Sequence, residues 1–368
     1  MEVLILSCKT GGGHNTAAEA VKEELERRGH HTVFLDPYLL AGPSLDRTVG
    51  NAYVKLVQGC PKAFGTLYQM GEVVRRIPLQ SPVYYANAKI AKKLGEYMAE
   101  HSFDCIVMTH LFPAEMITWL KRKGYRLPPC VFIATDYTCI PFTEETDCDY
   151  YIIPSEELTE EFVRKGIEKE KIKPLGIPVR AAFQKKAVSR REAGRRKKDT
   201  RYLLVAGGSI GAGSMERVLQ KIKRRLRGQK DWVCIAVCGN NYGLYKKLKK
   251  KYGSDQQYII LGKTGCMERY MEICDLFLSK PGGLSSTEAA VLGVPLLHIS
   301  PIPGCESRNL KFFAGRGMSY NSLGKKMHRQ KELFMDDELL EQLRFNQKKY
   351  CKADAAGKIC DFLENIKN

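Results

Sequence analysis

The 368-residue sequence has no run of about eighteen consecutive apolar residues, the length that a membrane-spanning helix needs. Its first apolar stretch, Val3 to Leu6, is far too short for a signal peptide. We therefore expect no membrane-spanning segment and a chain that resides in the cytoplasm.

The thirteen cysteines include no CxxC pair, and their odd number and scattered positions argue against a disulfide framework or a zinc site. Most of them lie in apolar runs, as buried cysteines in a reducing compartment do. The seven histidines show no metal-ligand spacing either. We expect neither a metal ion nor a bound cofactor.

No zinc-finger spacing, aromatic RNA-binding signature or basic heptad accompanies the net charge of +18. A surface of this charge attracts polyanions, so an anionic membrane surface, rather than nucleic acid, is the expected partner. One basic run, from Ser189 to Arg201, is typical of a solvated linker. Another segment bends at Pro78 and Pro82 and suits either a membrane surface or an ordinary solvated helix face; it carries Arg75, Arg76, Tyr84, Tyr85, Lys89, Lys92 and Lys93.

Short apolar runs alternate with helical patterns, which indicates an α/β fold with parallel sheets. The expected strands are residues 3–7, 32–35, 105–109, 131–135 and 150–153 in the first half, and 201–208, 232–239, 257–261, 276–280 and 295–299 in the second. The pattern predicts two doubly wound domains in tandem. Their expected bounds are residues 1–180 and 201–345, joined by a basic linker at 181–200 and followed by a C-terminal helix at 346–368 that could pack back on the first domain.

The stretch TGGGHNTAA, residues 10–18, joins the first strand to a helix expected from about Asn15. Glycines at this position let an anion approach the helix N-terminus, as in dinucleotide-binding folds. Asp36, at the end of the second strand, would then bind the ribose, so an NAD-dependent oxidoreductase is an alternative. That alternative leaves His14 unexplained, because a histidine beside this loop suits proton transfer as well as helix capping.

A second glycine loop, AGGSIGAGS at residues 206–214, follows the first strand of the second domain. The two loops suggest a cleft between the domains, with one ligand from each side. A third cluster, SKPGGLSSTEAAVLGVPLLHISPIPGCESRN, spans residues 279–309. There Glu288 could accept the ribose hydroxyls of a nucleotide, or could form a capping box with Ser285.

TGGGHNTAA, IATDY at residues 133–137, KPGGLSSTEAAVLGVP and PIPGCESRNLKFF together resemble the monogalactosyldiacylglycerol synthases and the bacterial processive diacylglycerol glucosyltransferases. The resemblance extends from residue 2 to about residue 320. It implies a GT-B fold, in which two Rossmann-like domains face a central cleft. The C-terminal domain would hold a UDP-sugar, the N-terminal domain a lipid acceptor, and transfer would invert the anomeric carbon without a metal.

The resemblance also implies roles for individual residues. His14 would deprotonate the acceptor hydroxyl, and Asp136 would orient the acceptor or His14. Glu288 would bind the ribose. The other substrate-binding residues that it implies are Gly11, Gly12 and Gly13 near the acceptor, Gly208 and Ser209 near the diphosphate, Gly239 and Asn240 near the nucleotide, Gly282, Gly283, Ser286 and Thr287 at the phosphates, and Pro303, Gly304, Glu306 and Asn309 at the sugar.

One departure concerns the sugar: where relatives commonly carry glutamine, this chain has Cys305, and a thiol cannot replace the donors and acceptor of an amide. The sequence predicts a peripheral enzyme on the inner face of the cell membrane that transfers glucose or galactose to diacylglycerol or a related glycolipid. Another lipid or a soluble acceptor is the alternative. The sugar, the number of sugars added and the oligomeric state, a homo-oligomer included, stay open.

Overall fold

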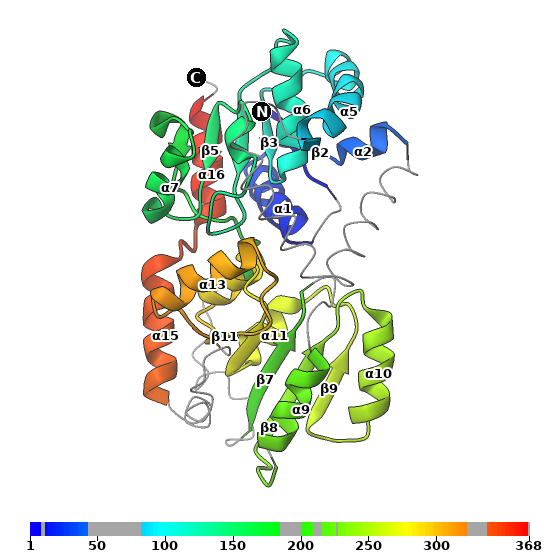
Figure 1. The fold of residues 1–368 in the computed structure, drawn as a ribbon, viewed down its shortest axis with the longest axis vertical. Helices are drawn as coiled ribbons and strands as arrows, with labels where there is room; N and C mark the ends of the chain where they lie inside the picture. Colours follow the sequence, from blue (N-terminus) through cyan, green and yellow to red (C-terminus); the bar gives the residue numbers. More distant parts are fainter. Residues whose placement is uncertain are drawn as a thin grey trace. The chain divides into compact units, whose positions relative to one another are not determined.

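The computed structural model describes residues 1–8, 12–42, 82–184, 200–208, 215–225, 227–321 and 337–366. The chain forms two compact units. Unit 1 comprises Met1–Ala181, Pro303–Cys305 and Lys352–Asn368, and unit 2 comprises Ala182–Ile302 and Glu306–Cys351. Each unit is built on its own six-stranded parallel sheet (Figure 1).

The sheet of unit 1 has the strand order β2-β1-β3-β4-β5-β6. Its strands are β1 (Glu2–Leu6), β2 (His31–Leu35), β3 (Cys105–Met108), β4 (Cys130–Ile133), β5 (Tyr150–Ile152) and β6 (Ile172–Lys173). The described helices of this unit are α1 (Gly12–Arg27), α2 (Pro37–Leu40), α5 (Pro82–Ala99), α6 (Leu111–Arg122), α7 (Thr159–Arg164) and α16 (Ala355–Ile366), with the 3-10 turns η1 (Thr143–Glu145), η2 (Glu156–Leu158) and η3 (Lys169–Lys171). The short α8 (Ala181–Gln184) lies where unit 1 gives way to unit 2.

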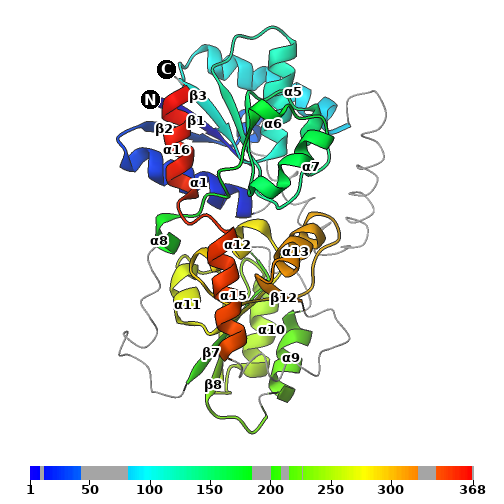
Figure 2. The same ribbon diagram turned by 90° about the vertical axis from the view of Figure 1, so that its left-hand side faces the viewer.

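Helices cover both faces of this sheet, with α1 and α16 on one face and α5 and α6 on the other (Figures 1 and 2). Alternate strand residues such as Val3 and Ile5 pack against α1 and α16, because successive side chains of a strand point to opposite faces. From α16, Ile359, Cys360 and Leu363 are fully buried in this core. The C-terminal helix is therefore part of the first unit's interior.

The sheet of unit 2 has the order β12-β11-β10-β7-β8-β9, the 3-2-1-4-5-6 arrangement of dinucleotide-binding folds when its strands are numbered from β7. Its strands are β7 (Arg201–Ala206), β8 (Trp232–Val237), β9 (Tyr258–Leu261), β10 (Leu276–Ser279), β11 (Leu296–His298) and β12 (Ser319–Asn321). Its described helices are α9 (Met215–Arg225), α10 (Tyr242–Tyr252), α11 (Met267–Ile273), α12 (Gly283–Val291), α13 (Cys305–Gly315) and α15 (Asp337–Tyr350).

The prediction of two doubly wound, Rossmann-like α/β units is confirmed, and each of the ten expected strands overlaps an observed one. Three details differ. The edge strands β6 and β12, of two and three residues, are too short to leave an apolar run in the sequence. Helix α1 begins at Gly12 rather than near Asn15, so two glycines belong to its first turn. The helical stretch at the C-terminus divides into α15 and α16.

Two expectations fall largely outside the described residues. The basic linker is described only at residues 181–184 and 200, and the segment that bends at Pro78 only from residue 82 onward. In the part that is described, Lys89, Lys92 and Lys93 lie exposed on α5. No helix in the described part of the chain has the length and apolar character needed to cross a bilayer.

Candidate active site

Three loops of unit 1 meet where β1, β3 and β4 end. His14 is the third residue of α1, which follows β1; Thr109 follows β3, and Thr135 and Asp136 follow β4. The strand order changes direction between β1 and β3, and open α/β sheets bind ligands at such a point, outside the carboxyl ends of the strands. The loops therefore form the expected place for a substrate in this unit.

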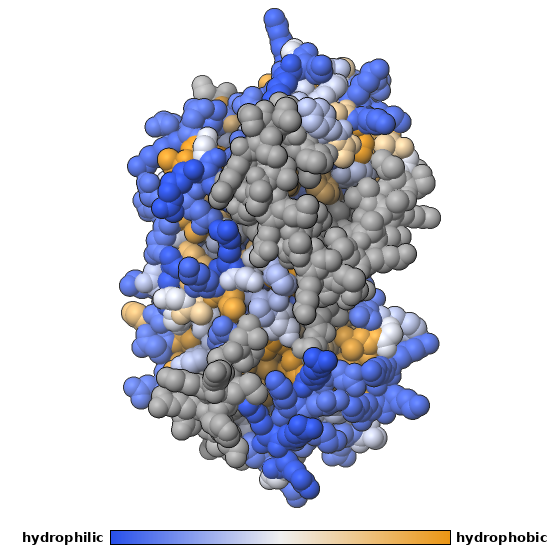
Figure 3. All heavy atoms as spheres, in the orientation of Figure 1, coloured by the Kyte–Doolittle hydropathy of each residue, from blue (hydrophilic) through white to orange (hydrophobic). Residues whose placement is uncertain are grey.

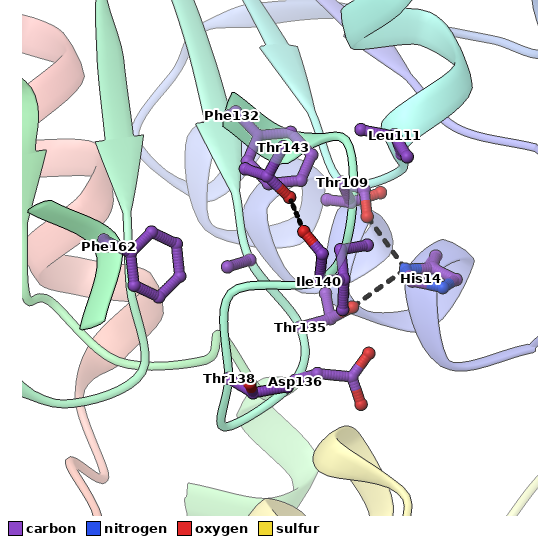
Figure 4. Close-up of a pocket in the computed structure, with 11 residues that line it drawn as sticks. His14, Thr109, Leu111, Phe132, Thr135, Asp136, Thr138, Ile140, Thr143 and Phe162 are labelled. Carbon is purple, nitrogen blue, oxygen red and sulfur yellow. Dashed lines mark hydrogen bonds between the residues drawn. The ribbon is translucent and has the colours of Figure 1, made fainter. Parts of the chain in front are cut away.

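One ring nitrogen of His14 is held by two oxygens. Nδ1 lies 2.8 Å from the carbonyl oxygen of Thr109 and 2.8 Å from Oγ1 of Thr135 (Figure 4). A carbonyl can only accept, so Nδ1 carries the hydrogen, and in the neutral ring Nε2 keeps its lone pair. Nε2 has no hydrogen-bond partner among the described residues. This tautomer lets Nε2 accept a proton.

The surroundings also favour the neutral form of His14. Burial lowers the pKa of its imidazole below 6.5, while the negative charge of Asp136 and the Thr109 carbonyl oppose that shift. The Asp136 carboxylate lies on the same side of its loop as the His14 ring (Figure 4). A neutral base beside a carboxylate can take a proton, and the carboxylate then stabilises the imidazolium.

A chain of hydroxyls fixes the start of α1 against the sheet. Thr109 Oγ1 donates to Ser7 Oγ at 3.1 Å, and Ser7 Oγ donates to Asn15 Oδ1 at 2.6 Å. The loop after β4 is held in turn by Glu161 of α7, which accepts from Thr138 Oγ1 at 2.5 Å and from the Cys139 amide at 3.0 Å. These bonds orient the His14 ring and the Asp136 loop before any substrate arrives.

The pocket beside His14 is lined by both polar and apolar residues. Its polar residues include Thr109, Thr135 and Asp136. Its apolar lining comes from Leu111, Phe132, Ala134, Ile140 and Phe162. Hydrogen-bonding and apolar side chains therefore both lie beside the His14 ring.

His110 was not predicted as a member of this site. Its ring centroid lies 4.6 Å from that of His14, edge to face at 74°, and its Nδ1 accepts from the Phe112 amide at the start of α6. Burial, and then the proximity of His14, hold its pKa well below 6.5. A neutral His110 adds no positive charge that would compete with protonation of His14. The sequence THLF, residues 109–112, places His110 directly after a buried strand, and this position could have identified it as a site residue.

In unit 2, the equivalent change of strand direction lies between β7 and β10. Gly208, after β7, has φ +72°, a conformation that favours glycine. A Cβ at that position would lie 3.5 Å from Cε of Lys280, which follows β10. The glycine loop and a lysine thus meet at the expected nucleotide site.

Lys280 was not predicted from the sequence as a member of this second site. Its Nζ lies 2.9 Å from Oε1 of Glu306, and only 9% and 12% of the two side chains are exposed. The other carboxylate oxygen of Glu306 accepts from the Ile302 amide at 2.7 Å. Both oxygens of Glu306 are therefore engaged, and its contact with the sugar stays a prediction. The position of Lys280, directly before PGG at a strand end, could have identified it.

Helix α12 begins with glycine and presents backbone amides there. Gly282 is its N-cap and supplies no side-chain cap, so the first-turn amides are available to an anion. The capping-box alternative is wrong, because Ser285 is the third residue of the helix rather than its N-cap. Glu288 lies in the second turn of α12 and is buried.

Ser286 and Thr287, whose hydroxyls we expect at the phosphates of the nucleotide, form hydrogen bonds within unit 2. Ser286 Oγ lies 2.9 Å from His298 Nε2, and Thr287 Oγ1 donates to the Gly283 carbonyl at 2.7 Å. Asn309 is fully buried and donates to the Pro281 carbonyl at 3.0 Å, which holds the PGG turn. These contacts support the shape of the turn, and the substrate roles of the three residues stay predictions.

The remaining predicted residues lie in turns or outside the described chain. Gly239 and Asn240 follow β8, with Gly239 at φ +58°. Pro303 and Gly304 precede α13, with Gly304 at φ +115°. Gly12 and Gly13 open α1. Gly11 and Ser209 are not among the described residues.

Two aspartates of unit 1 have structural roles. Asp36, the expected ribose ligand of a dinucleotide enzyme, is buried and caps α2 by accepting from the Tyr38 amide at 3.0 Å. Asp149, in the DCD sequence that resembles a metal motif, accepts from the Cys130 amide at 2.7 Å and pairs with Lys121 at 2.8 Å. No group of three or more potential metal-ligating side chains occurs in the ranges that the structure describes.

Comparison with solved structures identifies the fold. MurG from Acinetobacter baumannii aligns with a TM-score of 0.64 at 14% identity, covering 99% of each chain. A UDP co-structure of MnaA from S. aureus aligns with a TM-score of 0.64 at 13% identity, covering 99% of this chain and 96% of that one. Anabaena HepE, in complex with UDP and glucose, gives 0.56 at 11% identity, with 99% of both chains covered. The fold is therefore GT-B.

Sequence comparison relates this chain to particular glycosyltransferases within the GT-B fold. A processive diacylglycerol beta-glucosyltransferase from Bacillus subtilis is 25% identical over 355 residues, 94% of this chain and 90% of the relative. An uncharacterized glycosyltransferase, YkoN, from the same organism is 24% identical over 96% of this chain and 94% of its own. Residues 14–179 match the family model of monogalactosyldiacylglycerol (MGDG) synthase, and residues 202–356 match the C-terminal domain of glycosyltransferase family 28. The chain is thus a glycosyltransferase, with an N-terminal domain of the MGDG synthase family and a C-terminal domain of glycosyltransferase family 28.

Proposed function

We propose that this protein transfers a hexose, glucose or galactose, from a UDP-sugar to diacylglycerol or a related glycolipid, with inversion at the anomeric carbon. The observation that carries the proposal is the geometry of His14, whose Nε2 is free to accept a proton at the switch point of unit 1. That unit matches the MGDG synthase family, and the B. subtilis relative is named for diacylglycerol glucosylation. Two of the similar structures contain UDP.

The proposed reaction starts at the acceptor hydroxyl. Nε2 of His14 takes the hydroxyl proton as the oxygen attacks the anomeric carbon, the bond from that carbon to the UDP oxygen breaks, and UDP leaves with the electron pair. Asp136 stabilises the imidazolium that forms. The proton then passes from His14 to solvent or to the departing diphosphate.

The leaving group needs positive charge and hydrogen-bond donors, and unit 2 offers both. Lys280 supplies a charge beside Gly208, and the first-turn amides of α12 supply donors. We propose that the diphosphate lies against these groups and that Glu288 binds the ribose. In this proposal the groups that stabilise the departing diphosphate belong to the protein, and the UDP-sugar is a co-substrate.

The acceptor lipid places the enzyme at a membrane, and we propose that it acts peripherally at the cytoplasmic face. Which hexose it uses depends on contacts around Glu306 and Asn309. Cys305, at the start of α13, stands where relatives commonly have glutamine, so the choice between glucose and galactose is part of the test.

The test is a donor panel. The purified protein is incubated with UDP-glucose, UDP-galactose or UDP-N-acetylglucosamine and with diacylglycerol in neutral detergent, and the lipid fraction is analysed by mass spectrometry. A hexose-sized mass increase on diacylglycerol with a UDP-hexose is expected. Sugar found only in water-soluble product, or no transfer from any UDP-sugar, would contradict the proposal.

A further inference from the structure

Helices α9 and α10 of unit 2 lie side by side. Glu216 of α9 pairs with Lys247 of α10 at 2.7 Å and with Lys251 at 3.3 Å. Both helices bury their apolar residues in the same core, to which α9 contributes Leu219 and α10 contributes Leu248. Their outer faces therefore form one continuous surface, which is largely hydrophilic in Figure 3.

The two helices carry much of the protein's positive charge. The sequences MERVLQKIKRR and YGLYKKLKKKY hold ten lysines and arginines and one glutamate, a net +9 of the chain's +18. The exposed members at helical spacing on the outer faces form what we call the basic ridge: Arg217, Lys221 and Arg224 on α9 and Lys246, Lys249 and Lys250 on α10.

The basic ridge is not neutralised from within. None of its six side chains forms an ion pair with a residue in the ranges that the structure describes. A surface whose only role was solubility would be served by interspersed charges of both signs. Charge of one sign on adjacent helices is instead complementary to an extended anionic partner.

An exposed tyrosine extends the basic ridge at the start of α10. Tyr242 is 64% exposed, its ring stacks on Tyr245 with centroids 6.1 Å apart, and Lys246 Nζ lies 4.6 Å from its centroid. Tyrosine beside lysine is typical of surfaces that contact lipid headgroups, because the phenol ring suits the interface and the ammonium attracts anionic lipid.

We propose that the basic ridge docks unit 2 on an anionic lipid bilayer. The choice of a bilayer among polyanions rests on the proposed function, since the acceptor is then a membrane lipid. The docking holds the nucleotide-binding unit at the surface where that lipid resides. It is distinct from the α5 surface, on which Lys89, Lys92 and Lys93 lie in unit 1.

The test compares triple variants by co-sedimentation with vesicles of phosphatidylcholine, with or without phosphatidylglycerol. K246Q/K249Q/K250Q removes three charges from the basic ridge, and K311Q/K348Q/K349Q removes three exposed charges elsewhere in unit 2 as the matched control. K89Q/K92Q/K93Q removes three exposed lysine charges from α5 of unit 1. Each near-surface lysine contributes about fivefold to partitioning, so the ridge variant is expected to lose about 100-fold in affinity for phosphatidylglycerol vesicles. The other two variants should change by less than about threefold.

Several results would overturn the proposal: unchanged vesicle affinity in the ridge variant, an equal loss in the matched control, or a loss confined to the α5 variant. So would a ridge variant that loses affinity for a labelled duplex DNA while its vesicle affinity is retained, because that would assign the surface to nucleic acid. UDP affinity and a thermal melt of each variant report whether it is folded.

A second assay, sugar transfer to diacylglycerol in neutral detergent, tests the proposed function without a bilayer. It therefore distinguishes a failure of the docking proposal from a failure of the proposed function. The ridge variant should keep wild-type activity there, since no bilayer is present. If neither protein transfers sugar but the vesicle affinities differ as expected, the docking holds and the proposed function fails.

Discussion

At His14, the two ring nitrogens have different surroundings, and the difference decides what the residue can do. The Thr109 carbonyl fixes the hydrogen on Nδ1, and Nε2 is left with a lone pair. The sequence alone left capping and proton transfer as alternatives. Capping is a task for the residue before α1, whereas His14 is its third residue and is bonded to the neighbouring loops.

The first prediction concerns Asp136→Asn. The charge of Asp136 raises the pKa of His14 against the larger effect of burial, so its removal should lower that pKa further. Since only neutral His14 can accept the proton, activity is lost as the pH falls through this pKa. The acid limb of kcat/KM should therefore lie below pH 6.5 in the wild type and at still lower pH in the variant, as measured between about pH 5 and 8. An unchanged or higher limb would contradict the pairing of the two residues.

The second prediction concerns the pair of Lys280 and Glu306. Lys280→Met should weaken UDP binding about 10- to 100-fold, the value of a charge-assisted hydrogen bond to the diphosphate, as titration calorimetry would measure. The same change leaves the Glu306 carboxylate buried without its cation, which costs about 3–5 kcal/mol of stability.

The double variant K280M/E306Q distinguishes these two effects. It should recover most of the stability, because a neutral amide can still accept from the Ile302 amide, but it should not recover UDP affinity. Recovery of UDP affinity together with stability would show that Lys280 acts only through the fold.

At the scale of elements, α6 contains an unusual buried acid. Glu115 is fully buried, and its carboxyl group lies within hydrogen-bonding reach of the Glu145 side chain in η1. Burial, and then the negative charge of Glu145, raise its pKa to about 10, opposed by Arg122. The residue is therefore protonated in the folded protein at neutral pH.

A pKa raised on folding makes stability fall with pH. Above the unfolded value of 4.5 the unfolded chain loses the proton that the folded chain keeps, so the contribution of Glu115 declines from about pH 5 toward pH 10. Glu115→Gln, which mimics the protonated form, should therefore raise the melting temperature more at pH 8 than at pH 5. An equal effect at both pH values would mean that Glu115 is not protonated in the folded state.

The elements that the sequence predicted are those with long apolar or periodic patterns, and the misses have physical causes. The strands β1, β7 and β8 are continuous apolar runs, whereas β12 is Ser-Tyr-Asn and carries no such signal. The motifs identified the PGG turn, but not that the side chains of Ser286 and Asn309 point inward to partners distant in sequence. Pairings such as that of Lys280 with Glu306 depend on tertiary contacts, which no local pattern reports.

At the scale of the whole molecule, each unit has its own core and its own tryptophan. Trp119 lies in α6 of unit 1 and Trp232 in β8 of unit 2, and the sequence contains two tryptophans. Leu363→Ala leaves a cavity under α16 and should destabilise unit 1 by about 2–5 kcal/mol.

Fluorescence in single-tryptophan backgrounds can assign this loss to one unit. In the W232F background, Leu363→Ala should shift the unfolding transition that Trp119 reports to a lower urea concentration. In the W119F background, the free energy of unfolding that Trp232 reports should stay within about 0.5 kcal/mol of the value without Leu363→Ala. Equal shifts for both reporters would show that the two cores do not respond separately to the loss of Leu363.

Under the proposed function, unit 1 activates the acceptor and unit 2 holds the donor. His14→Ala tests this most directly, through kcat/KM for transfer to diacylglycerol and the Kd for UDP measured on the same preparation. Loss of the base should lower kcat/KM by about 100- to 10,000-fold, while the Kd for UDP stays within about twofold of the wild type. Transfer that persists at the wild-type rate, or UDP affinity that falls as far as transfer does, would contradict the account.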